Sequence, residues 1–172
     1  MKTSILALIA TGALAAFANA ETTVKISNVH LCCKGCVTGV EKAVGKAKGV
    51  TAVVDKDAGT VTLSAADKAA VQGGVDALVA AGYYGKSDSS DVSLKDTSGA
   101  KDGKVSMLTV NDVHLCCGKC VTAVTKAIEK VKGVTGNNAE KGVKSFEVKG
   151  DFSPKEVFAA LQAAGLTGKA GK

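Results

Sequence analysis

One seven-residue motif occurs twice in this sequence and constrains what the whole chain can fold into. His-Leu-Cys-Cys-Lys-Gly-Cys at residues 30–36 returns as His-Leu-Cys-Cys-Gly-Lys-Cys at residues 114–120. The two copies contain all six cysteines and both histidines of the chain. Thiolates and imidazoles hold soft and borderline metal ions, and three sulfurs with one nitrogen could fill a four-coordinate shell. The duplication therefore predicts two similar domains, each with a site for metal or thiol chemistry.

Residues 1–20 have the pattern of a secretory signal peptide. Lys2 precedes an apolar run from Ile5 to Phe17, and a small-x-small cleavage sequence ends at Ala20. The apolar run is shorter than a membrane-spanning helix requires. We therefore expect cleavage near Ala20 and a mature protein that is periplasmic or secreted.

The rest of the chain is long enough for two small domains joined by a polar linker. The displacement of 84 residues between the motifs predicts one domain over residues 21–87 and a second over residues 104–172. Residues 88–103 are rich in Ser, Asp, Lys and Gly, which is typical of a flexible linker. Aromatic residues make up 3% of the chain, so the cores must be built from smaller aliphatic side chains. Each small core predicts modest stability.

The apolar spacing in the first repeat predicts an α+β domain with the order strand, helix, strand, strand, helix, strand. Val24 and Ile26 alternate with polar residues as in a half-buried strand, and apolar residues recur at helical spacing after the first motif. The predicted strands are 23–27, 51–55, 60–64 and a short one after Gly85, and the predicted helices are 36–48, ended by Gly49, and 67–81.

The second repeat predicts the same order with a weaker hairpin. Its predicted strands are 105–110, 134–138 and 145–148, and its first helix is 120–132, ended by Gly133. Ser153 is expected to cap a last helix that begins at Pro154, where a missing N–H does no harm. Residues 166–172 are expected to fray.

Composition argues against nucleic-acid binding and against the common enzyme classes. The net charge is +6 without any Arg, and the Lys residues lie among acids as on a solvated helix face. Both histidines lie inside the motifs, and neither a nucleophile elbow nor a glycine-rich phosphate loop follows a predicted strand. We therefore expect neither a nucleic-acid partner nor an enzyme.

Each motif places a C-x-x-C pair where a loop becomes a helix. Cys33 and Cys36, like Cys117 and Cys120, can aim their sulfurs at one point if the second cysteine lies in the first helical turn. The positive end of the helix dipole favours the thiolate, which is the form that binds metal or attacks a disulfide. A third cysteine in each repeat leaves an odd number of thiols, which counts against a purely structural disulfide framework.

The segment from Val24 through the first motif to Val44 resembles the heavy-metal-associated domain, a family that includes copper chaperones and the periplasmic mercury-binding protein. The resemblance covers nearly all of the mature chain as two tandem copies, and it implies two ferredoxin-like βαββαβ sandwiches. By this resemblance Cys33, Cys36, Cys117 and Cys120 would be the primary metal ligands. It also implies that the loop at residues 83–84 packs near the site and that a metal donor or acceptor protein is the partner.

The sequence departs from the family pattern at several positions. Leu31 and Leu115 stand where the family usually has Met. Four further residues of the motifs are additions to the pattern and become candidate extra ligands: Cys32, Cys116, His30 and His114.

We expect an exported protein that binds a soft metal at two His-x-Cys-Cys-x-x-Cys sites and captures, sequesters or hands on that metal. Cu(I) is the first candidate, with Zn(II) and Hg(II) as alternatives. The second hypothesis is a thiol–disulfide oxidoreductase that uses the C-x-x-C pairs. The third is a non-catalytic adaptor in which a disulfide pins the loop. Whether the two domains cooperate stays open.

Overall fold

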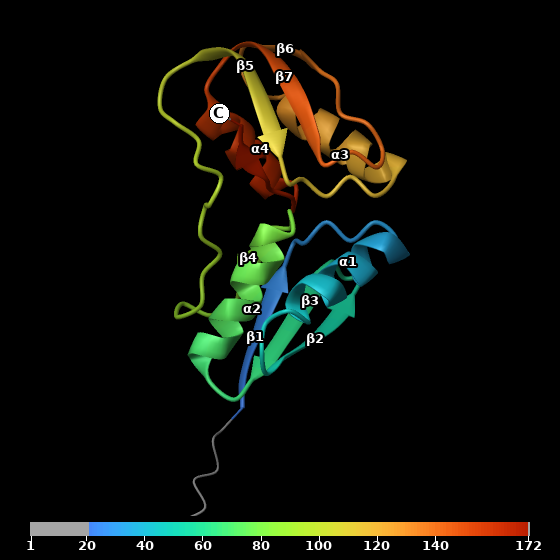
Figure 1. Cartoon of the computed structure of the whole chain (residues 1–172), viewed down its shortest axis with the longest axis vertical. Helices are drawn as coiled ribbons and strands as arrows, with labels where there is room; N and C mark the ends of the chain where they lie inside the picture. The colour runs from blue at the N-terminus through green and yellow to red at the C-terminus, as the bar shows by residue number, and fades with distance from the viewer. Residues whose placement is uncertain (1–20, 172) are drawn as a thin grey trace, which may run out of the picture.

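The computed structural model describes residues 21–171, which form two domains stacked along the long axis of the molecule (Figure 1). The predicted signal peptide lies outside the described residues. Within residues 21–171 no helix has the length and apolar character needed to cross a membrane.

Domain one is a four-stranded antiparallel sheet with two helices. Its elements are β1 (Thr22–Ser27), α1 (Lys34–Val44), β2 (Val50–Asp55), β3 (Thr60–Ala65), α2 (Lys68–Ala80) and β4 (Lys86–Ser87). The strands lie in the order β2-β3-β1-β4, so the first strand is central and the last strand returns beside it. This is the ferredoxin-like arrangement that the sequence predicts.

Side-chain periodicity explains how domain one positions the first motif. Val24 and Ile26 are buried on the helix side of β1, while Lys25 between them is exposed. On α1 the buried residues recur at helical spacing, and Cys36 is the first of them, followed by Val40. Cys36 is therefore held in the core of its own domain and not on a free loop.

Domain two repeats this architecture. Its elements are β5 (Val105–Asn111), α3 (Gly118–Ile128), β6 (Val134–Asn137), β7 (Ser145–Phe152), α4 (Pro154–Ala163) and β8 (Lys169–Ala170). The strand order is β6-β7-β5-β8, equivalent to that of domain one. The hairpin is less regular, with a register shift between Val134 and Gly136, as its weak strand propensity predicts.

Three local predictions are wrong. The first helices end at Val44 and Ile128, several residues before Gly49 and Gly133, because the chain tightens there into turns with i to i−3 hydrogen bonds, such as Ala47 N to Val44 O at 2.8 Å. Ser153 occupies the N-cap position of α4, but within the described structure its side chain makes no capping hydrogen bond.

The C-terminal segment is the third correction. It does not fray over residues 166–171: Leu166 is fully buried, and β8 pairs with β5 through Ala170 and Val110. Gly171 N also donates to Thr109 O at 2.7 Å. The segment is ordered because it supplies the fourth strand, which the Gly- and Lys-rich sequence does not reveal.

The linker, residues 88–103, contains no helix or strand and packs against both domains. Val92 is buried, and Tyr84 donates its hydroxyl to Leu94 O at 2.9 Å. Ala170 N donates to Ser98 O at 2.7 Å on the side of domain two. The linker thus lies along one side of the molecule (Figure 1). Its flexibility stays a prediction.

Candidate metal centre

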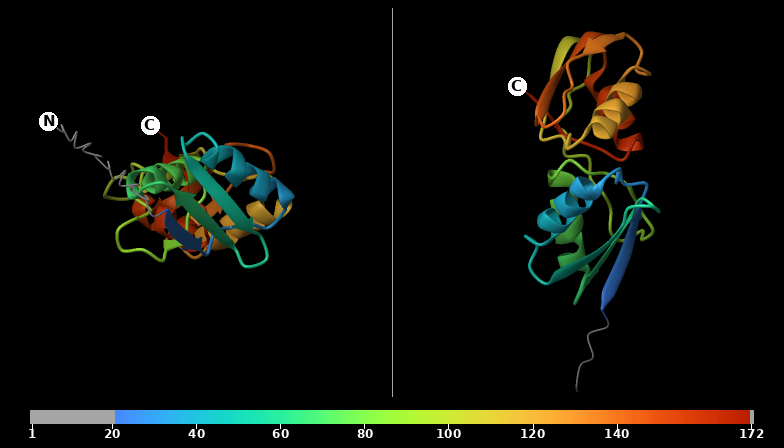
Figure 2. Two further views of the ribbon diagram at one scale, coloured as in Figure 1. Left: turned by 90° about the horizontal axis from the view of Figure 1, so that it is seen from below. Right: turned by 90° about the vertical axis from the view of Figure 1, so that its right-hand side faces the viewer.

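The two motif loops meet at the junction between the domains. The loop between β1 and α1 and the loop between β5 and α3 lie at the facing ends of the two domains, as two perpendicular views show (Figures 1 and 2). The sequence predicts one site per repeat, and the structure brings both motifs to one place. The two sets of predicted ligands therefore share one location.

Backbone hydrogen bonds join the domains around this place in a nearly symmetric way. Tyr84 N donates to Gly165 O at 3.1 Å, and the equivalent Thr167 N of domain two donates to Gly82 O at 2.9 Å. His30 N also donates to Gly165 O, at 3.2 Å. Tyr83 and Leu166 form an antiparallel bridge between the domains.

The two glycines of this junction are required by conformation and by space. Gly82 and Gly165 have φ angles of +87° and +79°, which side chains rarely adopt. A Cβ atom on Gly165 would lie 2.5 Å from Asn28 O, and one on Gly82 would lie 2.7 Å from Asp112 O. The lack of a side chain at both positions therefore allows the two domains to approach closely.

All six cysteine sulfurs lie in one cluster. Cys36 and Cys120 are fully buried, and the other four cysteines are half-buried. Within the repeats, Sγ of Cys36 is 3.8 Å from Sγ of Cys33, and Sγ of Cys120 is 3.8 Å from Sγ of Cys117. The third cysteine of each motif joins them, with Cys32 Sγ 3.7 Å from Cys36 Sγ and Cys116 Sγ 3.6 Å from Cys120 Sγ.

The shortest sulfur–sulfur distances cross the domain junction. Cys32 Sγ is 3.3 Å from Cys117 Sγ and 3.5 Å from Cys120 Sγ. Cys116 Sγ is 3.4 Å from Cys33 Sγ and 3.5 Å from Cys36 Sγ, and the two buried sulfurs are 3.8 Å apart. A metal–sulfur bond of about 2.3 Å places neighbouring sulfurs of a tetrahedral shell about 3.8 Å apart. The cluster therefore has the spacing of a metal–thiolate site, and it draws ligands from both domains.

The two histidines lie against this cluster, each toward the other domain. His30 can offer a ring nitrogen within 4.8 Å of the sulfurs of Cys32 and Cys120, and the side chain of His114 lies within hydrogen-bonding reach of Cys36. Nε2 of each ring is buried and has no hydrogen-bond partner among the residues that the structure describes. A buried unpaired nitrogen beside thiols is suited to metal coordination.

Tyr83 holds the His114 side of the centre. Its ring packs on the His114 ring with centroids 4.6 Å apart and an interplanar angle of 32°, and its hydroxyl donates to Cys36 O at 2.9 Å. Burial raises the pKa of the Tyr83 hydroxyl, and the nearby thiols raise it further, so it is a permanent hydrogen-bond donor. This confirms the prediction that the tyrosine loop packs near the site.

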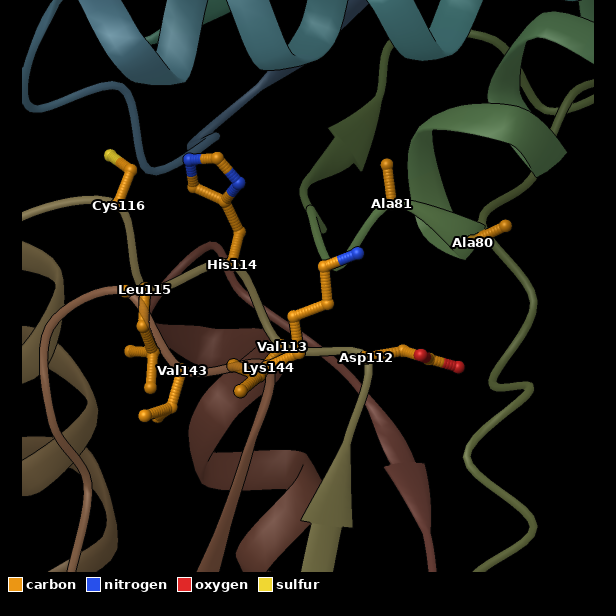
Figure 3. A pocket seen from close by; sticks show the side chains of 10 residues that line it. Ala80, Ala81, Asp112, Val113, His114, Leu115, Cys116, Val143 and Lys144 are labelled. Carbon is orange, nitrogen blue, oxygen red and sulfur yellow. The ribbon is translucent and has the colours of Figure 1, made fainter.

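A cavity of about 340 Å³ opens beside His114 at the junction. Figure 3 shows His114 and Cys116 projecting from the loop of domain two toward domain one, while Leu115 points back into its own domain. The end of α2, at Ala80 and Ala81, forms the opposite wall. Leu115 is thus a core residue.

The two buried thiols, Cys36 and Cys120, differ in pKa. The hydrogen bond from the Cys120 thiol is the largest influence that lowers the pKa of Cys36, and the His114 and Cys116 side chains lower it further. The same contact with Cys36 raises the pKa of Cys120, and burial adds to the increase. A thiolate in the middle of the cluster, held by neighbouring thiols, is therefore favoured.

Two of the half-buried thiols, Cys117 and Cys32, also differ in pKa. Burial raises the pKa of Cys117, but the backbone N–H groups of Cys120 and Lys119 and the Cys32 thiol outweigh it and bring the pKa to about 6. Burial and the hydrogen bond to Cys117 raise the pKa of Cys32 to about 12. The helix N-terminus thus favours a thiolate at the N-cap, as the sequence predicts.

Every cysteine and histidine that the sequence singles out lies in this one centre, including the additions to the family pattern. Sequence reasoning missed the role of Gly39, where a Cβ atom would lie 2.2 Å from the Tyr83 hydroxyl oxygen and 3.0 Å from His114 Cε1. A comparison of the two repeats could have revealed this role. Where the first repeat has Gly39 and Tyr83, the second has the larger Ala123 and the smaller Leu166, which pairs with Tyr83 across the junction.

Comparison with known proteins adds little. No protein-family model matches the chain, and no curated protein sequence matches it. The N-terminal soluble domains of Bacillus subtilis CopA resemble it at 17% identity and a TM-score of 0.31, over 88% of this chain and 95% of that one. The first two RRM domains of the yeast poly(U)-binding protein Pub1 resemble it at 11% identity and a TM-score of 0.24, over 87% of this chain and 95% of that one. At these scores neither likeness bears on the site.

Proposed function

We propose that this protein binds a soft metal ion, with Cu(I) as the first candidate, at the cysteine centre between its two domains. The observation that carries the proposal is the convergence of six sulfurs from both repeats at distances of 3.3 to 3.8 Å. Soft thiolate ligands select Cu(I) and Zn(II) over harder metal ions. The resemblance of both motifs to heavy-metal-associated domains supports the same conclusion.

The alternative metals make different demands on the site. Zn(II) needs four ligands, which His30, Cys32 and Cys120 could begin to supply together with one more sulfur. Hg(II) needs fewer ligands and would be satisfied by one C-x-x-C pair. The sulfur-rich centre suits the soft Cu(I) ion, and it would also accept Zn(II).

Capture of metal outside the cytoplasm is the physiological role that we infer. The predicted signal peptide supports export, and an oxidising compartment would require reduced thiols at the moment of metal uptake. Buried sulfurs at the centre suit holding a metal, and the half-buried ones suit exchange with a donor or acceptor protein. The protein supplies ligands and no catalysed reaction in this proposal.

A second function, thiol–disulfide exchange, is favoured by one observation. The Cys117 thiol has a pKa of about 6, is half-buried, and lies 3.3 Å from Cys32 Sγ. A low-pKa thiol beside a second thiol can attack a disulfide and be resolved. This function would proceed without metal.

Competition titration of the reduced mature protein against a chromogenic Cu(I) chelator, under anaerobic conditions, tests the first function. We expect binding that is lost on oxidation and weakens as pH falls, because protons compete for the thiolates. A Thr38→Ser/Thr122→Ser variant, changed at equivalent positions of α1 and α3 without touching sulfur, is the control. Turnover of a disulfide substrate by metal-free protein, without measurable Cu(I) binding, would favour the oxidoreductase instead.

A further inference from the structure

We infer that the six cysteines form one polynuclear Cu(I)–thiolate core of four copper ions, rather than two separate sites of one ion each. This inference rests on the proposed function and specifies what that site holds. It depends on the arrangement of the six sulfurs in space.

The six sulfurs occupy the corners of a distorted octahedron. Most neighbouring pairs are 3.3 to 3.8 Å apart. The further pairs Cys32–Cys33, Cys33–Cys117 and Cys116–Cys117 lie within 4.8 Å. The pairs left over share no cysteine and are the opposite corners of the octahedron: Cys32 and Cys116, Cys33 and Cys120, Cys36 and Cys117.

An octahedron of sulfurs has triangular faces, and each face can hold one three-coordinate metal. Four faces that meet only at corners are Cys32–Cys33–Cys117, Cys33–Cys36–Cys116, Cys116–Cys117–Cys120 and Cys32–Cys36–Cys120. Every cysteine belongs to two of these faces. With each sulfur bridging two metals and each metal bound by three sulfurs, the six cysteines serve four ions.

The size of the faces suits copper–thiolate bonds. Three sulfurs around one ion at a bond length of about 2.3 Å are separated by about 4.0 Å. The distances within the faces lie on both sides of this value, from 3.3 Å to the limit of 4.8 Å. Small shifts of the motif loops would therefore close each face on an ion, with no rearrangement of either domain.

Three of the four faces that hold a metal take sulfurs from both domains, and the fourth, Cys116–Cys117–Cys120, lies within domain two. Two independent sites would instead pair the cysteines within each repeat, as the family resemblance implies. Four cross-domain pairs, at 3.3 to 3.5 Å, are shorter than the two C-x-x-C pairs, at 3.8 Å. The third cysteine of each motif, which the family pattern does not explain, is a bridging ligand in this core.

The surroundings stabilise a core of this charge. Four Cu(I) ions and six thiolates carry two net negative charges, and the N-termini of α1 and α3 both point their N–H groups at the cluster. His30 and His114 lie at its flanks, where a ring nitrogen can donate to a thiolate or bind a copper ion. The burial of Cys36 and Cys120 excludes water from the middle of the core.

The deciding experiment uses the opposite corners Cys32 and Cys116. We would load the reduced mature protein and its Cys32→Ser/Cys116→Ser variant with Cu(I) and count copper by anaerobic native mass spectrometry. The variant keeps both C-x-x-C pairs, so two separate sites would keep their copper. The Thr38→Ser/Thr122→Ser variant serves as the control, and circular dichroism of the metal-free proteins checks that each variant folds.

We expect the unaltered protein to pass from metal-free to four copper ions with few intermediate species, and the variant to lose the four-copper state. X-ray absorption spectroscopy should show a short copper–copper distance in the unaltered protein and none in the Cys32→Ser/Cys116→Ser variant. Two ions bound one at a time, unchanged in the Cys32→Ser/Cys116→Ser variant, would overturn the polynuclear core and leave metal binding intact. No Cu(I) binding at all would overturn the proposed function as well.

Discussion

At the scale of single residues, the centre is asymmetric although the motifs are not. Tyr83 stacks on His114 and bonds to Cys36 O, whereas Leu166 occupies the matching place in domain two. Gly39 leaves room for the tyrosine, and at the equivalent positions the second repeat has Ala123 and the smaller Leu166. In each repeat the sizes of the helix residue and the loop residue compensate: the smaller Gly39 goes with the larger Tyr83, and Ala123 goes with Leu166.

This matching predicts a compensating pair of substitutions. Gly39→Ala places a methyl group where the Tyr83 hydroxyl lies, and overpacking of this kind typically costs about 1–3 kcal/mol of unfolding free energy. Adding Tyr83→Leu recreates the pairing of domain two and should recover most of that loss, except for the hydrogen bond, which is worth about 0.5–1.5 kcal/mol. Urea unfolding of both single variants and the double variant measures the coupling. Additive losses would show that the two positions do not meet.

The thiol pKa values predict an order of alkylation in the metal-free, reduced protein. At pH 7 Cys117, with a pKa of about 6, is mostly thiolate, while the raised pKa of Cys32, about 12, keeps that thiol protonated. The pKa of Cys116 is also raised, mainly by burial. Iodoacetamide should therefore label Cys117 before Cys32 and Cys116, and labelling of Cys117 should slow as pH falls below about 6. Peptide mapping by mass spectrometry reports the order, and equal rates at the three thiols would contradict it.

The identity of the ligands could be predicted from sequence, but their grouping could not. The duplicated motif marks every cysteine and histidine of the centre because no other position in the chain has these side chains. Their meeting depends on how two domains pack, and that packing rests on backbone bonds of Gly82 and Gly165. Backbone hydrogen bonds between domains leave no side-chain pattern in a sequence.

At the scale of elements, strands and helices could be predicted more securely than their ends. Alternation in β1 and helical spacing in α1 follow directly from burial of one face. The early end of α1 at Val44 depends on a tightened turn, and the order of β8 depends on pairing with β5. The strand pairing is a tertiary contact, and the tightened turn exchanges i−4 for i−3 hydrogen bonds, which the apolar pattern does not distinguish.

The turn after α4 predicts a variant that separates the domains without changing a ligand. Gly165→Ala puts a Cβ atom 2.5 Å from Asn28 O and should open the junction, whereas Gly49→Ala strains a similar left-handed backbone, φ +71°, with nothing within 4 Å. Gly165→Ala should therefore weaken Cu(I) binding at least about 10-fold, on the scale of losing a supporting contact, and Gly49→Ala should not. Chelator competition measures both. Equal affinities for the two variants would show that the junction does not form the site.

At the scale of the whole molecule, the linker brings the two half-sites together. A short linker, if flexible as the sequence predicts, gives two linked groups an effective concentration in the millimolar range, so that the second domain need not be captured from solution. Residues 88–103 run along both domains, and Gly99 and Gly103 lie in open space on this path. An insertion at either glycine should leave the packed contacts of the linker in place.

This arrangement predicts that metal holds the two domains together once the linker is cut. With a protease site inserted after Gly103, the loaded protein should remain one particle after cleavage, because copper ions bridge cysteines of both halves. The metal-free protein, cut in the same way, keeps backbone bonds such as Thr167 N to Gly82 O, the packing of Tyr83 on His114 and the linker bond from Ala170 N to Ser98 O. It lacks the metal bridges and should separate on dilution to concentrations at which the loaded protein stays whole. Native mass spectrometry of the cut protein, with and without Cu(I), distinguishes the two. A cut Cys32→Ser/Cys116→Ser variant, which lacks one ligand from each domain and one corner of every metal-binding face, is the control and should separate in both conditions. If the loaded halves part and each carries its own copper, the metal is bound within single domains and the shared centre is wrong.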